Sequence, residues 1–175
     1  MNPRAAIPLL VFAAIVLLLW SGIGKDPRVL PSVLIGRPAP QFSAPELRDP
    51  GVQHDRASLL GKPFLLNVFA SWCPTCRIEH PILARYVRER GLRLVGLHWK
   101  DESEDGLAWL QQYGDPYAQI LHDPSGRIGI DFGVTAAPES FVIDANGTIL
   151  YKHIGALSVE DMENTVMPLL QGRKR

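Results

Sequence analysis

The sequence predicts an α/β domain in which a mixed β-sheet carries helices on both faces, preceded by one N-terminal transmembrane helix. Three observations predict this architecture. A nearly continuous apolar run at residues 64–69 is typical of a strand covered on both faces. A Cys-x-x-Cys pair, Cys73 and Cys76, follows that run and opens a helical pattern. Asn146-Gly147 separates two further strand patterns, which is a strong hairpin signal.

Composition bounds the class of protein. The 175 residues, less an N-terminal segment, suit one domain with its own core. Hydrophobic residues make up 46% and charged residues 21%, which is typical of a globular chain. The 18 basic residues balance the 18 acidic ones, so nothing indicates a nucleic-acid partner. Two cysteines are too few for a structural disulfide framework.

Residues 1–24 are predicted to form a membrane anchor. Residues 5–23 carry no charged side chain and would rise about 28 Å as a helix, enough for a bilayer core. The competing interpretation is a cleaved signal peptide. The apolar run exceeds the roughly 7–15 residues of a signal-peptide core, and no Ala-x-Ala site follows it, so we favour the anchor. The short N-terminal tail favours export of the C-terminal side.

The domain is predicted to occupy residues 37–172. Residues 25–36, with their prolines and glycines, indicate a linker, and residues 173–175 form a basic tail. Asp49-Pro50-Gly51 marks a turn, and residues 57–63 a short loop.

Strand and helix patterns then alternate along the domain. Predicted strands cover residues 64–69, 92–99, 140–144 and 148–153. Predicted helices cover residues 75–90, 105–113, 127–132 and 158–170. Gly91 is a natural end for the first helix. Ser158 is expected to cap the last one, with Asp161 completing a capping box.

The two cysteines indicate redox chemistry. Free N–H groups and the dipole at a helix start favour a thiolate on Cys73, while Cys76 lies one turn into the helix. The alternative is half of a zinc site, which needs four ligands. With no other cysteine, the nearest candidate ligand is His80, which lies on the same helix. We therefore predict a reversible Cys73–Cys76 disulfide, with no metal and no other cofactor.

Pro138 precedes a predicted hairpin strand. A proline in this position can follow a cis peptide bond. An ordinary turn before the strand is the alternative. The histidines His80, His98, His122 and His153 show no convergent spacing, so we interpret them as structural. Trp99 and Lys100 end a predicted strand and are expected to border the site.

The run from Asn67 to Pro81, Asn-Val-Phe-Ala-Ser-Trp-Cys-Pro-Thr-Cys-Arg-Ile-Glu-His-Pro, resembles the active site of the cytochrome c biogenesis thiol:disulfide interchange proteins (CcmG/DsbE type) of the thioredoxin superfamily. The resemblance extends to residues 35–40, 116–117, 132–134 and 137–144. It therefore covers nearly the whole chain. Trp72 is shared with thioredoxins in general. The more particular residues are Pro74, Thr75, Glu79, His80, Pro81 and Glu139.

This resemblance implies a thioredoxin-like fold with a cis-proline beside the cysteines. Ala137, Pro138 and Glu139 would then contribute to a peptide-binding surface. Two residues depart from common patterns. Asn67 stands where general thioredoxins carry a buried aspartate, which agrees with the biogenesis family but removes the usual proton acceptor. Ala136 stands where family members commonly have glycine, and its methyl group could narrow the substrate groove.

Two carboxylates are expected to tune the site. Glu79 lies three residues after Cys76, and Glu139 adjoins Pro138. An anionic neighbour raises the pKa of a thiol, which makes the dithiol a better reductant. Replacing either residue with glutamine should therefore raise the reduction potential. The alternative is that both are solvated surface acids.

Dithiol exchange is the expected mechanism, in which Cys73 attacks a substrate disulfide and Cys76 resolves the mixed disulfide. The resemblance implies a reductant in cytochrome c maturation. Its substrates would be the haem-binding cysteines of apocytochrome c or other maturation proteins, and a membrane thiol-disulfide transporter would supply electrons. The domain would then lie on the periplasmic side of the inner membrane. Two alternatives remain open: an extracytoplasmic thiol oxidase or isomerase, and a module that binds apocytochrome without turnover.

Overall fold

The computed structural model describes residues 3–22 and 33–172. The chain divides into two units, Met1–Leu30 and Pro31–Arg175, which are considered separately. The first contains one helix, α1 (Pro3–Gly22). No helix within the described residues combines the length and hydropathy needed to cross a membrane. The anchor at residues 1–24 stays a prediction. Residues 25–32 of the predicted linker and the tail at 173–175 lie outside the described residues.

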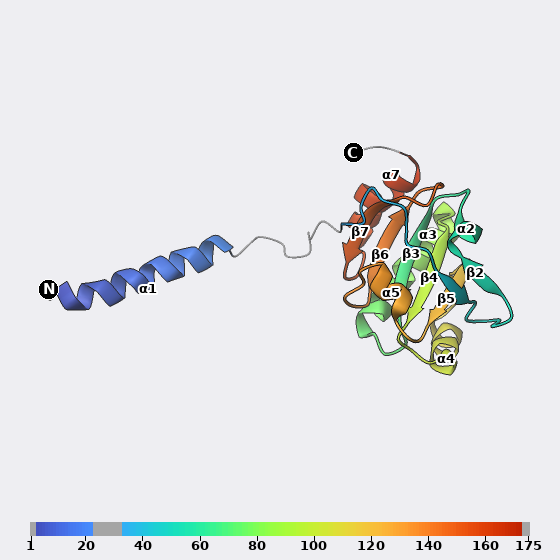
Figure 1. The fold of residues 1–175 in the computed structure, drawn as a ribbon, viewed down its shortest axis with the longest axis horizontal. Helices are drawn as coiled ribbons and strands as arrows, with labels where there is room; N and C mark the ends of the chain where they lie inside the picture. The colour runs from blue at the N-terminus through green and yellow to red at the C-terminus, as the bar shows by residue number, and fades with distance from the viewer. Residues whose placement is uncertain (1–2, 23–32, 173–175) are drawn as a thin grey trace. The chain divides into compact units, whose positions relative to one another are not determined.

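The second unit is built on a five-stranded sheet with the order β5-β4-β3-β6-β7 (Figure 1). The strands are β3 (Phe64–Phe69), β4 (Leu94–Trp99), β5 (Gln119–Asp123), β6 (Glu139–Ile143) and β7 (Ile149–Ile154). β3, β4 and β5 are parallel, whereas β6 runs antiparallel to both β3 and β7. Every residue of the central strand β3 is buried, as its apolar pattern predicts. The mixed sheet and the hairpin are confirmed.

Helices cover both faces of this sheet, also as predicted. On one face, α3 (Pro74–Arg90), α4 (Ser103–Tyr113) and the C-terminal helical segment contribute Leu83, Trp109 and Val166 to one core. On the other face, α2 (Arg56–Leu59) and α5 (Arg127–Asp131) contribute Leu59 and Ile128 to a second core.

The sequence does not predict four of the elements. β5 has only two fully buried apolar residues, Ile120 and Leu121, between polar ones, which is too short a pattern to identify. β1 (Ser43–Pro45) and β2 (Gln53–Asp55) form a small antiparallel pair around the predicted Asp49-Pro50-Gly51 turn. α2 lies where a loop is predicted, and a capping box starting at Asp55 fixes its single turn.

Local signals fix the ends of the longer helices. α3 begins at Pro74, one residue earlier than predicted, because proline suits the first helical position. Gly91 ends it in the left-handed conformation, with φ of 64°. The Ser158–Asp161 capping box is confirmed. The last predicted helix comprises α6 (Val159–Asp161), a π-helical turn η1 (Met162–Val166) and α7 (Met167–Leu170).

Candidate active site

The cysteine pair lies where the buried strand β3 ends and α3 begins. Cys73 is the N-cap of α3, and its Sγ accepts a hydrogen bond from the N–H of Cys76 at 3.1 Å. The two residues form the predicted disulfide, with their Cα atoms 5.3 Å apart. Both are buried. In the reduced protein, this N–H and the helix dipole would stabilise a thiolate on Cys73.

A more exposed rim surrounds the disulfide. Pro74 and Thr75 are exposed, and Trp72 is 51% exposed. The indole N–H of Trp72 donates to the carbonyl of Lys100 at 2.9 Å. Its ring centre lies 6.2 Å from that of Trp99. Trp99 and Lys100 therefore border the site, as the sequence predicts.

The peptide bond between Ala137 and Pro138 is cis, which confirms that expectation. Pro138 directly precedes β6, the strand that pairs with β3. A role of Ala137, Pro138 and Glu139 in holding a peptide stays a prediction.

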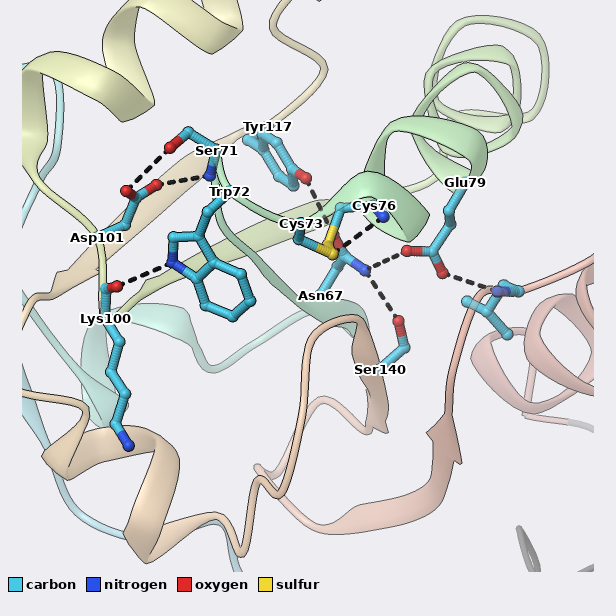
Figure 2. Close-up of a disulfide and its surroundings, with 11 residues drawn as sticks. Asn67, Ser71, Trp72, Cys73, Cys76, Glu79, Lys100, Asp101, Tyr117 and Ser140 are labelled. Carbon is cyan, nitrogen blue, oxygen red and sulfur yellow. Dashed lines mark hydrogen bonds between the residues drawn. A yellow bond between two sulfur atoms is a disulfide. The ribbon is translucent and has the colours of Figure 1, made fainter.

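A buried polar network lies beneath the disulfide (Figure 2). Asn67, in the middle of β3, donates from Nδ2 to Glu79 Oε2 at 3.0 Å and to Ser140 Oγ at 3.1 Å. Its Oδ1 accepts from the hydroxyl of Tyr117 at 2.9 Å. Glu79 Oε1 accepts from the backbone N–H of Leu157 at 2.8 Å. Every polar atom of the Asn67 amide group thus has a partner.

Glu79 is 1% exposed, so it is not a solvated surface acid. Burial raises the pKa of its carboxyl to about 7, although hydrogen bonds from Leu157 and Asn67 act in the opposite direction. Both donors are neutral, so no positive charge offsets the cost of desolvation. Glu79 lies three residues after Cys76 and therefore on the same side of α3. It can take up and release a proton near neutral pH beside the buried cysteine.

Asn67 supports a buried acid in this structure, although it is not an acid itself. The sequence predicts that asparagine here removes the buried acid found in general thioredoxins. The structure shows that Glu79 brings a buried acid to the same place from the neighbouring helix. An aspartate at position 67 would set two carboxylates about 3 Å apart, where they repel each other. Asparagine instead donates a hydrogen bond to Glu79. The buried acid is therefore supplied by helix α3 in this protein, and not by the central strand as in general thioredoxins.

Tyr117 and Ser140 complete the network, and sequence reasoning did not single out either one. Tyr117 is buried, and burial raises the pKa of its hydroxyl well above the ordinary value. It therefore acts as a neutral hydrogen-bond donor to Asn67. The only sequence signal for it was its place in the Pro116-Tyr117 segment of the family resemblance.

The expected action of Glu139 on the sulfurs needs correction. Side chains alternate along a strand, and Ser140 faces Asn67, so the Glu139 side chain points to the opposite face of β6. Its Oε2 forms an ion pair with Lys152 Nζ at 2.8 Å, in which the Glu139 side chain is completely buried and the Lys152 side chain is 7% exposed. Its Oε1 accepts from the N–H and hydroxyl of Thr135 and from the N–H of Ala136, at 2.9, 2.6 and 3.2 Å. Glu139 therefore holds the segment that leads to Pro138, and Lys152 neutralises its charge.

The histidines divide into two cases. His80 is buried, its Nε2 donates to the carbonyl of Gly114 at 2.9 Å, and burial lowers its pKa, which agrees with a structural role. His98 and His122, which the sequence treats as unrelated, lie 3.0 Å apart between their Nδ1 atoms. No cluster of three or more metal-ligating side chains occurs among residues 3–22 and 33–172. The use of no metal or further cofactor stays a prediction.

Known proteins resemble this chain in sequence and in fold. A family model described as Redoxin matches residues 34–166. The thiol:disulfide interchange protein DsbE of Allochromatium vinosum is 47% identical over 167 residues, covering 95% of this chain and 92% of the relative. The DsbE of Escherichia coli K12 is 46% identical over 170 residues, covering 93% and 91%.

Solved structures agree with these sequence matches. The dsbF protein of Mycobacterium tuberculosis, in mixed oxidised and reduced forms, superposes with a TM-score of 0.65 at 30% identity, covering 74% of this chain and 95% of that one. A proposed DsbE of Chlorobium tepidum gives a TM-score of 0.64 at 28% identity, covering 78% and 97%.

Proposed function

Because the chain belongs to the Redoxin family and to the DsbE thiol:disulfide interchange proteins within it, we propose that this oxidoreductase works as a reductant in cytochrome c maturation. Its thioredoxin-like fold and its Cys73–Cys76 disulfide are those of a thiol:disulfide oxidoreductase. The proposed substrates are the disulfides formed between haem-binding cysteines of apocytochrome c. The family resemblance of residues 67–81 and 137–144 supports this choice.

The proposed reaction transfers two electrons from the dithiol to the substrate. The Cys73 thiolate attacks one sulfur of the substrate disulfide, that disulfide breaks, and one substrate thiolate leaves. Cys76 then loses its proton and attacks Cys73 Sγ. This step breaks the mixed disulfide, releases the second substrate thiol and leaves Cys73–Cys76 oxidised. Glu79 is the proposed acceptor of the Cys76 proton, since its pKa of about 7 suits proton transfer near neutral pH.

The observation that carries the reducing direction is the buried Glu79, whose hydrogen-bond donors are both neutral. A carboxylate beside a buried thiol disfavours a thiolate there. The reduced dithiol is then less stable relative to the disulfide, so it gives up electrons more readily. Glu139 does not enter this argument, because its charge is paired with Lys152.

The reduction potential tests this direction. We expect equilibration of the chain with glutathione to give a potential well below that of the strong oxidant DsbA, which is about −120 mV. Glu79→Gln should raise the potential, whereas Glu89→Gln on the exposed side of the same helix should not. A potential near that of DsbA would instead assign the chain as an oxidase.

Trapping identifies the substrate. In a Cys76→Ser variant the resolving step is blocked, so mixed disulfides through Cys73 should accumulate, and we expect peptides containing haem-binding cysteines among them. The variant lacking both cysteines should not support cytochrome c maturation. If that double variant still does, the chain acts as a binding module without turnover.

The proposal includes a membrane anchor and an electron donor. The uncharged apolar stretch at residues 5–23 supports single-pass insertion into the inner membrane, with the thioredoxin-like domain on the periplasmic side. A membrane thiol-disulfide transporter is the proposed donor that reduces Cys73–Cys76 again. The chain should stay in the membrane fraction after alkaline extraction. A variant with Leu17 and Leu18 both replaced by arginine should be released.

A further inference from the structure

A second polar network lies on the opposite side of the cysteine pair from Glu79. β3, β4 and β5 are parallel, so their carboxyl ends meet at one edge of the sheet. Ser71 follows β3, and Asp101 follows β4 in the same way. His98 lies near the end of β4, and His122 lies in β5 directly opposite it. The disulfide mechanism described above uses none of these four side chains.

Asp101 is the centre of this network. Its Oδ2 accepts from the backbone N–H of Ser71 at 2.6 Å and from His98 Nε2 at 2.8 Å. Its Oδ1 accepts from the hydroxyl of Ser71 at 2.9 Å and from the N–H of Glu102 at 3.2 Å. Asp101 is 8% exposed and its carboxylate accepts from four donors, so its position is closely defined.

The same loop also holds the next residue of the cysteine segment. Lys100 adopts a left-handed conformation with φ of 49°, and its carbonyl accepts the indole N–H of Trp72. Figure 2 shows Lys100 and Asp101 contacting Trp72 and Ser71 from one side, while Glu79 approaches from the other. Both residues immediately before Cys73 are thus fixed by the loop after β4.

The donor and acceptor atoms of the two histidines can be assigned from their partners. A carboxylate only accepts hydrogen bonds, so the contact with Asp101 requires a proton on His98 Nε2. Burial lowers the pKa of His98, which is completely buried, so it is neutral and its Nδ1 is an acceptor. His122 Nδ1 must then be the donor. The hydrogen bonds run from His122 through His98 to Asp101, and Ser71 donates to the same carboxylate.

The His122 end of this chain of hydrogen bonds reaches the surface. His122 is half-buried and lines a polar cavity of about 300 Å³ together with Asp123, Arg127 and Asp131. Asp123 accepts from the N–H of Gly129 at 2.9 Å, which ties it to α5.

Other charges near the pair lie on neighbouring elements. The negative charges of Asp101 and of Asp105 on α4 act to raise the pKa of His98, against the larger effect of burial. On β1 and the residues after it, Glu46 is paired with Arg48 and His54.

We propose that Asp101 is a positioning residue that holds the Ser71–Trp72 segment for disulfide exchange, and that protonation of His122, relayed through His98, makes the exchange rate pH-dependent. An imidazolium at position 122 partly offsets the negative charge of Asp101. The potential at Cys73 becomes more positive, which favours its thiolate. Both roles concern thiol-disulfide exchange at Cys73 itself and do not depend on which disulfide the protein reduces.

The Ser71 amide proton reports directly on this coupling. In the oxidised full-length chain carrying Glu79→Gln, neither a thiol nor residue 79 titrates, so we expect the amide resonance of Ser71 to shift between pH 5 and 8 in proton–nitrogen NMR spectra. His122→Asn keeps a donor where Nδ1 lies but cannot become charged, so the shift should disappear. His122→Leu removes the donor, and the Ser71 resonance should differ at every pH. A shift that persists unchanged in His122→Asn would overturn the coupling.

Exchange kinetics test the positioning role. With the reduced chain and an oxidised peptide, the rate of wild type divided by that of His122→Asn should be about threefold higher at pH 6 than at pH 8. Asp101→Asn should lower the second-order rate constant about tenfold. The control, Asp105→Asn, removes a nearby exposed charge and should change the rate less than twofold. Equal rates for Asp101→Asn and Asp105→Asn would refute a positioning role for Asp101.

A milder variant distinguishes a loss of exchange rate from a folding defect. Ser71→Ala keeps the backbone N–H and loses only the hydroxyl donor. It should lower the rate in the same direction as Asp101→Asn while the thermal midpoint of the oxidised chain stays close to that of wild type. A wild-type rate in Ser71→Ala together with a misfolded Asp101→Asn would assign Asp101 to folding alone.

Discussion

Replacing Glu79 with glutamine should remove a pH dependence from the stability of the oxidised protein. The network can accept the new side chain. Rotating the Asn67 amide by half a turn would present its Oδ1 to the glutamine NH₂ group. The hydroxyls of Tyr117 and Ser140 can each donate or accept, so they can follow this rotation. Glutamine Oε1 can still accept from Leu157.

The magnitude follows from the raised pKa. Folding moves the pKa of Glu79 from 4.5 to about 7, so between these values the folded state holds a proton that the unfolded chain has released. Stability therefore falls as pH rises through this window, and the whole penalty is present above it. Linkage gives a penalty of about 1 kcal/mol at pH 5 and about 3 kcal/mol at pH 8. Wild type should lose about 2 kcal/mol over this range relative to the glutamine variant.

Urea unfolding of the oxidised full-length chain at pH 5 and pH 8 measures this difference. Other groups also titrate, so the relevant quantity is the change in unfolding free energy for wild type minus that for Glu79→Gln. The matched control is Glu89→Gln, on the exposed side of the same helix, which should follow wild type at both pH values. Parallel pH profiles for wild type and Glu79→Gln would refute the conclusion that Glu79 titrates near neutral pH in the folded protein.

Three further predictions concern the site and its support. Asn67→Asp should lose several kcal/mol of stability at pH 8 relative to pH 5 in urea unfolding, since two buried carboxylates would lie about 3 Å apart; an unchanged pH profile would contradict this. Lys152→Met should cost about 3–5 kcal/mol of unfolding free energy because it leaves Glu139 buried and unpaired, and adding Glu139→Gln should recover part of the loss; purely additive losses would refute the pairing. Ser158→Ala should cost about 1 kcal/mol by removing an N-cap, seen as a lower thermal midpoint, whereas Ser158→Asp should stay near wild type.

Elements with a strong local pattern could be predicted from the sequence. The apolar run of β3, the hairpin turn at Asn146-Gly147 and the Ser158 cap each depend on residues close together in the chain. The disulfide also followed from the sequence, because Cys73 and Cys76 lie one helical turn apart. Propensity, periodicity and capping act over a few residues, so a single sequence displays them.

The tertiary structure decided how distant residues combine. Asn67 meets Glu79 across 12 residues and Tyr117 across 50, and Ser71 meets Asp101 across 30. The packing of strands, loops and helix α3 brings these side chains together, and no local pattern encodes which of them meet. The sequence suggested two acids acting on the sulfurs, but strand alternation turns Glu139 toward Lys152 and leaves Glu79 beneath the cysteines. A residue's identity is local, whereas its burial, its partners and therefore its pKa depend on the packed fold.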